Sequence, residues 1–257
     1  RLKSQSAPKK ILAAVLVGED SASISFLKQK EKSAKELGID FRLYKFPEEL
    51  KNDDLRKEVG KIAALKKVGG IIIQLPLPKH INRHYVLNAM PREKDVDVLG
   101  ERALGSFYAD RNPVLPPVAG VVEEILKSRD LNPKSLKIAV VGLGLLIGRP
   151  IAIWLTGKTF ESYLLGKGSD FSILKNADLV IIGVGKTGLI KPEMLKEGAG
   201  VIDFGYGTDE NGKISGDFDA SLISNFSSLI SFYTPTPGGT GPILVAKLME
   251  NFYKLNP

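Results

Sequence analysis

Short apolar runs alternate with longer amphipathic stretches along the whole chain, which is typical of βαβ units around a mostly parallel sheet. The run 11–17 is predicted as a buried strand, and the stretch 21–37 is predicted as a helix that Gly38 closes. The same pattern predicts three further elements in this half: a strand at 41–46, a helix at 53–68 broken by Gly69 and Gly70, and a short strand at 71–74.

A proline-rich segment, 111–119, precedes the helical stretch 120–128 and is the best candidate for a domain boundary. Beyond it, helix and loop lengths typical of a doubly wound sheet separate five strand candidates, at 137–141, 162–165, 179–182, 200–204 and 229–232. The apolar positions of 242–255 have helical spacing and predict a C-terminal helix with a face to bury. The pattern therefore predicts an α/β fold with two lobes.

Composition excludes several classes of protein. No apolar run of the 257 residues is long enough to cross a bilayer, and the start lacks the apolar core of a signal peptide, so a cytoplasmic protein without a membrane partner is expected. Without cysteine, and with His80 and His84 as the only histidines, a metal site is not expected. The net charge of +7 is scattered among few aromatic residues, which argues against nucleic acid as a partner.

The predicted strand 137–141 runs into a glycine-rich turn with Gly142, Gly144 and Gly148, and a helix can begin directly after it. Such a turn lets backbone N–H groups approach a pyrophosphate, although glycines at a tight turn can equally serve close packing. The acidic residue that usually follows the next strand and binds an NAD ribose is absent. Lys167 stands there instead and could meet a 2′-phosphate.

Motifs spread over nearly the whole chain are more specific. They are VGEDSAS at 17–23 with Phe26 and Lys30, QLPLP at 74–78, KDVD at 94–97, IGRP at 147–150, VID at 201–203 and TPTPGGTGP at 234–242. Together, and in this order, they resemble the methylenetetrahydrofolate dehydrogenase/cyclohydrolase family. The last stretch is the most specific, because so long a Pro/Gly pattern seldom recurs by chance.

The resemblance implies oxidation of 5,10-methylenetetrahydrofolate with a nicotinamide cofactor, usually NADP with NAD as the alternative, and hydrolysis of the product to 10-formyltetrahydrofolate. It also implies an N-terminal α/β catalytic lobe, at 1–117 with the C-terminal segment 238–257, and a Rossmann-like doubly wound NAD(P)-binding lobe at 118–237. The C-terminal helix would return to the first lobe. A homodimer that binds tetrahydrofolate derivatives in the cleft between its lobes is expected.

Carried over residue by residue, the resemblance implies that Lys30 is the catalytic lysine, Gln74 its hydrogen-bond partner and Asp97 the carboxylate that holds the pterin ring. A lysine partly desolvated in a cleft has a lowered pKa and can activate water, although Lys30 taken singly would be assigned to a solvated helix face. The implied substrate-binding residues are Phe26, Leu75, Pro76, Pro237, Gly238 and Gly239. The implied cofactor-binding residues are Gly142, Leu143, Gly144, Ile147, Gly148, Lys167, Gly185 and Tyr206.

The chain also departs from the family pattern. Phe26 replaces the usual tyrosine and lacks its hydroxyl, which puts hydrolysis in question. Leu143-Gly144 and Leu165-Gly166 replace the polar pairs that hold a 2′-phosphate in the family, so weak discrimination between NADP and NAD is expected. The helix expected before residue 11 is largely absent, as in an incomplete copy. The alternatives are a relative with one activity and a non-catalytic nucleotide-binding relative.

Overall fold

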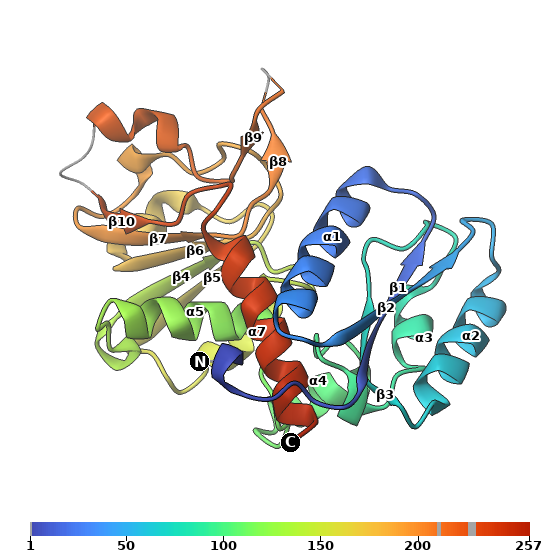
Figure 1. The fold of residues 1–257 in the computed structure, drawn as a ribbon. Coiled ribbons are helices and arrows are strands. Elements are labelled where there is room, and N and C mark those ends of the chain that lie inside the picture. Colours follow the sequence, from blue (N-terminus) through green and yellow to red (C-terminus); the bar gives the residue numbers. More distant parts are fainter. Residues whose placement is uncertain (1, 210–211, 226–229) are drawn as a thin grey trace. The chain divides into compact units, whose positions relative to one another are not determined.

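The computed structural model describes residues 2–209, 212–225 and 230–257. The chain divides into two compact units. The first unit consists of Arg1–Pro117 and Val245–Pro257, and the second unit consists of Val118–Leu244. Figure 1 follows the chain by colour and labels its helices and strands.

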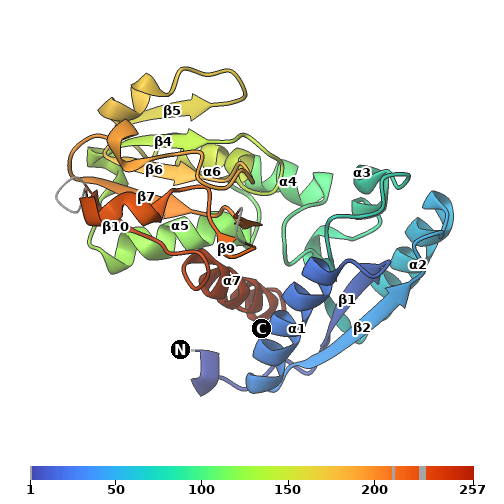
Figure 2. The ribbon, with the colours of Figure 1, turned by 90° about the horizontal axis from the view of Figure 1, so that it is seen from above.

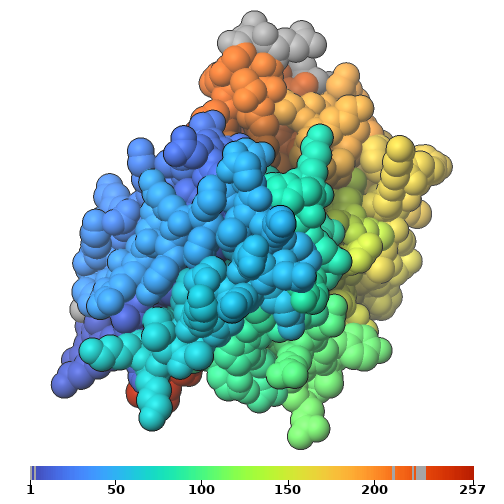
Figure 3. Space-filling model, turned by 90° about the vertical axis from the view of Figure 1, so that its right-hand side faces the viewer, coloured from blue at the N-terminus to red at the C-terminus, as the bar shows by residue number. Residues whose placement is uncertain are grey.

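A three-stranded parallel sheet with the order β2-β1-β3 forms the centre of the first unit. Its strands are β1 (Ile11–Val17), β2 (Asp40–Phe46) and β3 (Val68–Ile73), and its helices before residue 117 are α1 (Ser21–Glu36), α2 (Asn52–Ala64), α3 (Arg83–Leu87) and α4 (Glu101–Tyr108). Short 3-10 turns lie at Leu2–Ser4 and Arg92–Lys94. Strand β2 is at the edge and is largely exposed; Figure 3 shows the light-blue surface of β2 and α2 facing the viewer.

Helices cover both faces of this sheet, and every residue of its central strand β1 is therefore buried. Alternate side chains of a strand point to opposite faces. The odd-numbered residues of β1 pack with α2 and α3. The even-numbered residues pack with α1 and with α7 (Thr240–Leu255), the C-terminal helix. The views in Figures 1 and 2 show β1 between α1 and α2. The prediction that the C-terminal helix returns to the first lobe is therefore confirmed.

The prediction that Gly69 and Gly70 break a helix is wrong. Helix α2 ends at Ala64, and both glycines lie inside β3. A Cβ atom on Gly70 would lie 2.7 Å from Phe252 Cδ2 and 2.8 Å from Val96 Cγ1. These glycines therefore allow the C-terminal helix to approach the strand closely, which is a common reason for glycine within a strand.

A five-stranded parallel sheet with the order β10-β7-β6-β4-β5 forms the second unit. Its strands are β4 (Lys137–Val141), β5 (Glu161–Leu165), β6 (Leu179–Ile182), β7 (Ala199–Asp203) and β10 (Ile230–Tyr233). Their bounds agree with the predicted strands to within one residue. Leu229, the first residue of the predicted strand 229–232, lies outside the described residues. The helices are α5 (Pro117–Ser128) and α6 (Gly148–Leu155), with 3-10 turns at Pro133–Ser135, Phe171–Asn176, Pro192–Met194 and Ala220–Asn225. The strand order reverses between β4 and β6, and in open α/β sheets ligands bind beside such a reversal.

Two smaller features complete the second unit. Strands β8 (Gly207–Thr208) and β9 (Ile214–Ser215) form an antiparallel hairpin. Residues 238–244, which the family resemblance assigned to the first domain, group with the second unit. The Thr240 hydroxyl donates to the Asp203 carbonyl oxygen at 2.9 Å, which ties the start of α7 to the end of β7. None of the helices in the described ranges combines the length and the apolar character that crossing a bilayer requires.

Candidate active site

Lys30 lies on the buried stripe of α1 and not on its solvated face. This helix buries Ser23, Leu27, Lys30 and Ala34, a spacing that places all four side chains on one side. Asp20 begins the helix as its N-cap by accepting a hydrogen bond from the Ser23 backbone N–H at 2.8 Å. Only 5% of Lys30 is exposed, whereas Lys28 and Lys32 are exposed. The position of Lys30 on α1 therefore sets it apart from its lysine neighbours.

Gln74 holds the Lys30 ammonium group by a side-chain hydrogen bond. Lys30 Nζ donates to Gln74 Oε1 at 3.1 Å, and both side chains are buried. The orientation of the Gln74 amide is fixed because its Nε2 donates to the Leu75 carbonyl oxygen at 2.8 Å. Its backbone N–H donates to the Val15 carbonyl oxygen at 2.9 Å, which continues the pairing of β3 with β1. Gln74 thus turns an acceptor toward the amine without adding charge.

Asp97 interacts electrostatically with Lys30, and burial drives both groups toward their neutral forms. Burial lowers the pKa of Lys30, and the charge of Asp97 opposes that shift. Burial also raises the pKa of Asp97, and the charge of Lys30 opposes that shift. The third neighbour is Phe26, whose ring centroid lies 5.4 Å from Lys30 Nζ. The structure therefore brings Phe26, Lys30, Gln74 and Asp97 together within the first unit.

Asp95 is a buried carboxylate that the sequence analysis did not select. Its Oδ2 accepts hydrogen bonds from the backbone N–H groups of Leu99, at 3.0 Å, and Gly100, at 2.7 Å. The residue is 1% exposed, and its Oδ1 has no partner in the described part of the chain. Burial, with a smaller contribution from Asp97, raises the pKa of Asp95 to about 7. Asp95 therefore fixes the turn that carries Asp97.

The other implied substrate-binding residues lie in both units. Leu75 and Pro76 follow Gln74 in the first unit and are half-buried and exposed, respectively. Pro237, Gly238 and Gly239 belong to the second unit, in the turn before α7. Gly238 has a φ of 97°, which favours glycine, and a Cβ on Gly239 would lie 2.4 Å from the Pro235 carbonyl oxygen. The backbone of this turn therefore requires glycine at both positions.

The glycine loop after β4 folds tightly on itself. Gly142 has a φ of 90°, and a Cβ there would lie 2.6 Å from the Gly183 carbonyl oxygen. A Cβ on Gly148 would lie 1.7 Å from the Gly142 carbonyl oxygen, so only glycine can begin α6 at this point. By contrast, a Cβ on Gly144 or on Gly185 would have no neighbour within 4 Å. The backbone is therefore open at Gly144 in this loop and at Gly185 in the turn after β6, as contact with a pyrophosphate requires.

The remaining implied cofactor residues follow the carboxyl ends of parallel strands, so they share one edge of the sheet. Ile147 packs against Gly183, since a Cβ there would lie 2.4 Å from Ile147 Cγ2. Lys167 follows β5 and is exposed, and Tyr206 follows β7 and is 56% exposed. Leu143 lies in the loop, where its carbonyl oxygen accepts a hydrogen bond from Arg149 Nε at 3.0 Å. This edge offers an open backbone and a cation, which fits a dinucleotide.

Comparison with known proteins decides the family. The chain matches the models of the tetrahydrofolate dehydrogenase/cyclohydrolase catalytic domain over residues 1–97 and of the tetrahydrofolate dehydrogenase/cyclohydrolase NAD(P)-binding domain over residues 116–256. The chain belongs to the tetrahydrofolate dehydrogenase/cyclohydrolase family. The resemblance read from the sequence motifs is confirmed, and so are the two-lobed α/β fold and the enzyme class.

Relatives match this family member over most of its length. The bifunctional protein FolD of Staphylococcus aureus (strain Newman) is 33% identical over 242 residues, which cover 93% of this chain and 84% of that protein. The crystal structure of the bifunctional FolD enzyme from Campylobacter jejuni has a TM-score of 0.91 at 32% identity, covering 99% of this chain and 90% of that one. The FolD structure from Trypanosoma brucei, complexed with NADP and an inhibitor, has a TM-score of 0.88 at 26% identity. The match covers 96% of this chain and 86% of that one.

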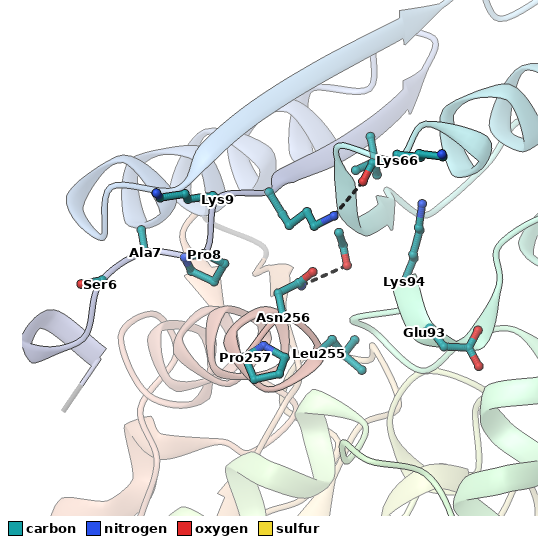
Figure 4. A pocket seen from close by; sticks show the side chains of 13 residues that line it. Ser6, Ala7, Pro8, Lys9, Lys66, Glu93, Lys94, Leu255, Asn256 and Pro257 are labelled. Atoms are coloured by element: carbon teal, nitrogen blue, oxygen red, sulfur yellow. Dashed lines mark hydrogen bonds between the residues drawn. The ribbon is translucent and has the colours of Figure 1, made fainter.

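A basic hollow of about 700 Å³ in the first unit of this family member contains none of the implied site residues (Figure 4). Its basic side chains are Lys9, Lys10, Lys66 and Lys94. Lys10 Nζ donates to the Lys66 carbonyl oxygen at 2.8 Å, and Lys94 Nζ donates to the carbonyl oxygens of Ala63 and Leu65 at 2.7 and 3.0 Å. Cations at the C-terminal end of a helix stabilise it, so these two ammonium groups have a structural role at the end of α2.

Proposed function

We propose that this chain oxidises 5,10-methylenetetrahydrofolate to 5,10-methenyltetrahydrofolate with NAD(P) and hydrolyses the product to 10-formyltetrahydrofolate, as an enzyme of one-carbon metabolism. The observation that supports the proposal most directly is the buried Lys30 amine, which is bonded to Gln74 and balanced by Asp97. Burying a cation without a full ion pair costs folding free energy, so such an arrangement points to catalysis more than to stability.

In the dehydrogenase step, the residues of the chain align the two reactants. Asp97 would accept hydrogen bonds from the amino and ring N–H groups of the pterin, and two such bonds fix both the position and the plane of the ring. When bound, NAD(P) supplies the hydride acceptor. Fixed orientation of two reactants accounts for a large part of a barrier reduction, so no side chain needs to exchange a proton in this step.

In the hydrolytic step, Lys30 would act on water. Water adds to the one-carbon bridge of the methenyl cation, the bond from that carbon to N5 breaks as N5 takes up one proton of the water, and the second proton leaves to give the 10-formyl product. A neutral amine can accept or relay this proton, and burial lowers the pKa of Lys30 toward the range in which the neutral form is available. Gln74 would keep the amine in place through its Oε1.

NADP is the proposed cofactor, with weak discrimination against NAD. The relative from Trypanosoma brucei is described as a complex with NADP. Here Lys167 is the cation next to the end of β5, where the ribose of a dinucleotide lies in this class of fold. Leu143 and Gly166 offer no charged side chain there, and the side chain of Leu143 reaches toward Gly166, with its Cδ1 4.0 Å from the position of a Cβ on that glycine.

A second candidate is a dehydrogenase without efficient hydrolysis, and Phe26 is the observation that favours it. The ring of Phe26 lies near the Lys30 ammonium group but carries no hydroxyl. The sequence resemblance further suggests a cytoplasmic homodimer that has tetrahydrofolate derivatives as its ligands and does not bind nucleic acid. Sedimentation of the purified chain at several concentrations would test the dimer.

The deciding experiment incubates the purified chain with methylenetetrahydrofolate and either NADP or NAD while the absorbance of the methenyl product is followed. Formation and subsequent decay of that absorbance is expected with both cofactors. Formation without enzymatic decay would select the second candidate. No cofactor-dependent formation with either dinucleotide would contradict the proposed function.

A further inference from the structure

Two buried carboxylates hold together the loops that follow β6 and β7 in the second unit. Asp203 is the last residue of β7, and Asp217 follows the β8-β9 hairpin; they are 2% and 0% exposed. The implied site does not include either residue. Buried carboxylates of this kind need backbone donors to remain ionised, so their hydrogen bonds identify the segments they hold.

Asp217 holds the turn after β6. Its Oδ2 accepts hydrogen bonds from the backbone N–H groups of Val184, at 2.6 Å, and Gly185, at 2.9 Å. Gly185 has a φ of 77°, and a Cβ there would have no neighbour within 4 Å, so this turn offers open backbone at the edge where the glycine loop also lies. The turn directly follows Gly183, on which Ile147 of the glycine loop packs.

Asp203 in turn holds the segment that carries Asp217. Its Oδ1 accepts from the Gly205 backbone N–H at 2.7 Å, and its Oδ2 accepts from the Phe218 backbone N–H at 2.9 Å. A Cβ on Gly216 would lie 2.0 Å from Asp203 Oδ2, and a Cβ on Gly205 would lie 2.4 Å from Asp217 Cγ. Each carboxylate thus occupies space that a side chain at a neighbouring glycine would fill.

We propose that Asp217 is a positioning residue for the dinucleotide, which fixes the backbone of Val184 and Gly185 against the glycine loop, and that Asp203 keeps Asp217 in register. The inference rests on the proposed function, because it needs a dinucleotide at this edge of the sheet. It adds to that function a residue whose side chain does not need to touch the cofactor. The turn lies beside the reversal of strand order between β4 and β6, where such a ligand binds.

The hydrogen bonding of Asp217 separates this role from a purely structural one. Its Oδ1 is buried and has no partner among the described residues, so only Oδ2, which bonds to the turn, contributes hydrogen bonds of this side chain. In Asp217→Asn the amide oxygen can still accept from the turn, while the amide NH2 takes the place of the unpartnered Oδ1, so the urea midpoint of unfolding should fall only modestly. The two bonds to the turn lose their ionic character, however, and bonds to a charged acceptor are about twice as strong as neutral ones.

The test is calorimetric titration of NADP and of NAD into wild type and Asp217→Asn, together with urea unfolding of both proteins. Asp219→Asn is the matched control, because Asp219 lies two positions away and its Oδ1 accepts hydrogen bonds from the backbone and hydroxyl of Ser221, within its own loop. We expect the dissociation constants of both dinucleotides to rise about tenfold in Asp217→Asn. The Michaelis constant for the folate should stay within about twofold, and the control should match wild type.

Each outcome decides a different statement. Unchanged dinucleotide affinity in Asp217→Asn would overturn the inference and leave the proposed function intact, whereas a wild type that binds neither dinucleotide would overturn the proposed function. If Asp217→Asn does not fold, amide exchange of the wild type replaces it. The amides of Val184 and Gly185 are then expected to exchange slowly before any ligand is added. If both amides exchanged fast and became slow only with NADP, the inference that Asp217 fixes the turn before the cofactor binds would be overturned.

Discussion

The Lys30 ammonium nitrogen lies 5.4 Å from the centre of the Phe26 ring. Phe26 precedes Lys30 by about one helical turn on α1. An aromatic face at this distance attracts a cation but cannot accept a proton from it or donate one to water. The identity of residue 26 therefore bears on the proton transfers of Lys30 and not on its position, which Gln74 holds.

Replacing Lys30 by methionine should separate the two reactions. Lys30→Met keeps most of the side-chain length and removes the amine, so methenyl hydrolysis should fall by about a hundredfold or more while methenyl formation is largely retained. Paired rates of methenyl formation and decay measure both effects. The exposed neighbour in Lys28→Met is the matched control and should behave as wild type. Unchanged decay in Lys30→Met would remove this lysine from the mechanism.

Phe26→Tyr is the complementary change. A hydroxyl placed beside Lys30 can donate or accept one hydrogen bond, so hydrolysis should rise by about tenfold if its absence limits the present chain. Methenyl formation should change by less than about twofold. The same paired rates measure the result, and a rate of decay equal to that of wild type would show that the missing hydroxyl is not limiting.

Asp95 should make stability depend on pH, because burial raises its pKa from 3.8 to about 7. Between about pH 4 and 7 the folded state keeps a proton that the unfolded chain has released. The free energy of unfolding should therefore fall as the pH rises through this range, by up to about 4 kcal/mol, and level off above it. Asp95→Asn should reduce that decline. Urea unfolding across this pH range, with exposed Asp54→Asn as control, measures the effect.

Two glycine substitutions should have opposite effects on stability. Gly70→Ala places a methyl group 2.7 Å from Phe252 Cδ2, so unfolding should become easier by about 1–3 kcal/mol. Gly60 lies inside α2 with nothing within 4 Å of an added Cβ, so Gly60→Ala should stabilise the fold by about 0.5–1 kcal/mol. Chemical denaturation of both variants tests the pair. A stabilised Gly70→Ala would contradict the close packing of α7 on β3.

Lys167 should affect NADP and not NAD. Loss of the ammonium group in Lys167→Ala removes the implied contact to a 2′-phosphate, so the dissociation constant for NADP should rise by about tenfold. Affinity for NAD serves as the internal control and should be unchanged. Calorimetric titration measures both. A thousandfold preference of the wild type for NADP that survives Lys167→Ala would require another phosphate-binding group.

The local pattern of apolar residues predicted the helices and strands well where a segment shows a single pattern, such as an unbroken apolar run. The β-branched and apolar runs gave β1 and β4 without error, because consecutive buried residues leave no other choice for such short segments. The error at Gly69 and Gly70 has a physical reason. A glycine that breaks a helix and a glycine that makes room for one look alike in sequence, and Phe252 lies about 180 positions further along the chain.

The residues of the candidate site also differ in how far the sequence alone could identify them. Taken singly, Lys30 would be assigned to the solvated face of its helix, and only the family motifs indicated that it is more than one lysine among several; the structure places it on the buried side with Leu27 and Ala34. Asp95 stands two positions before Asp97 within the same motif but shows its role only through the turn it folds. Asp217 could not be found locally at all, because the N–H groups it holds lie 32 and 33 positions before it.

The C-terminal helix has a consequence for how the chain is made. Leu248, Met249 and Phe252 complete a core whose strands are synthesised before the second unit, whereas the second unit is a continuous stretch of chain. During translation the second unit can close its core while the first unit still lacks α7. During that interval Leu12 and Leu16 of β1 lack their contacts with α7, although α1 can already pack against them. The first unit therefore reaches its complete core only after the whole of the second unit has been synthesised.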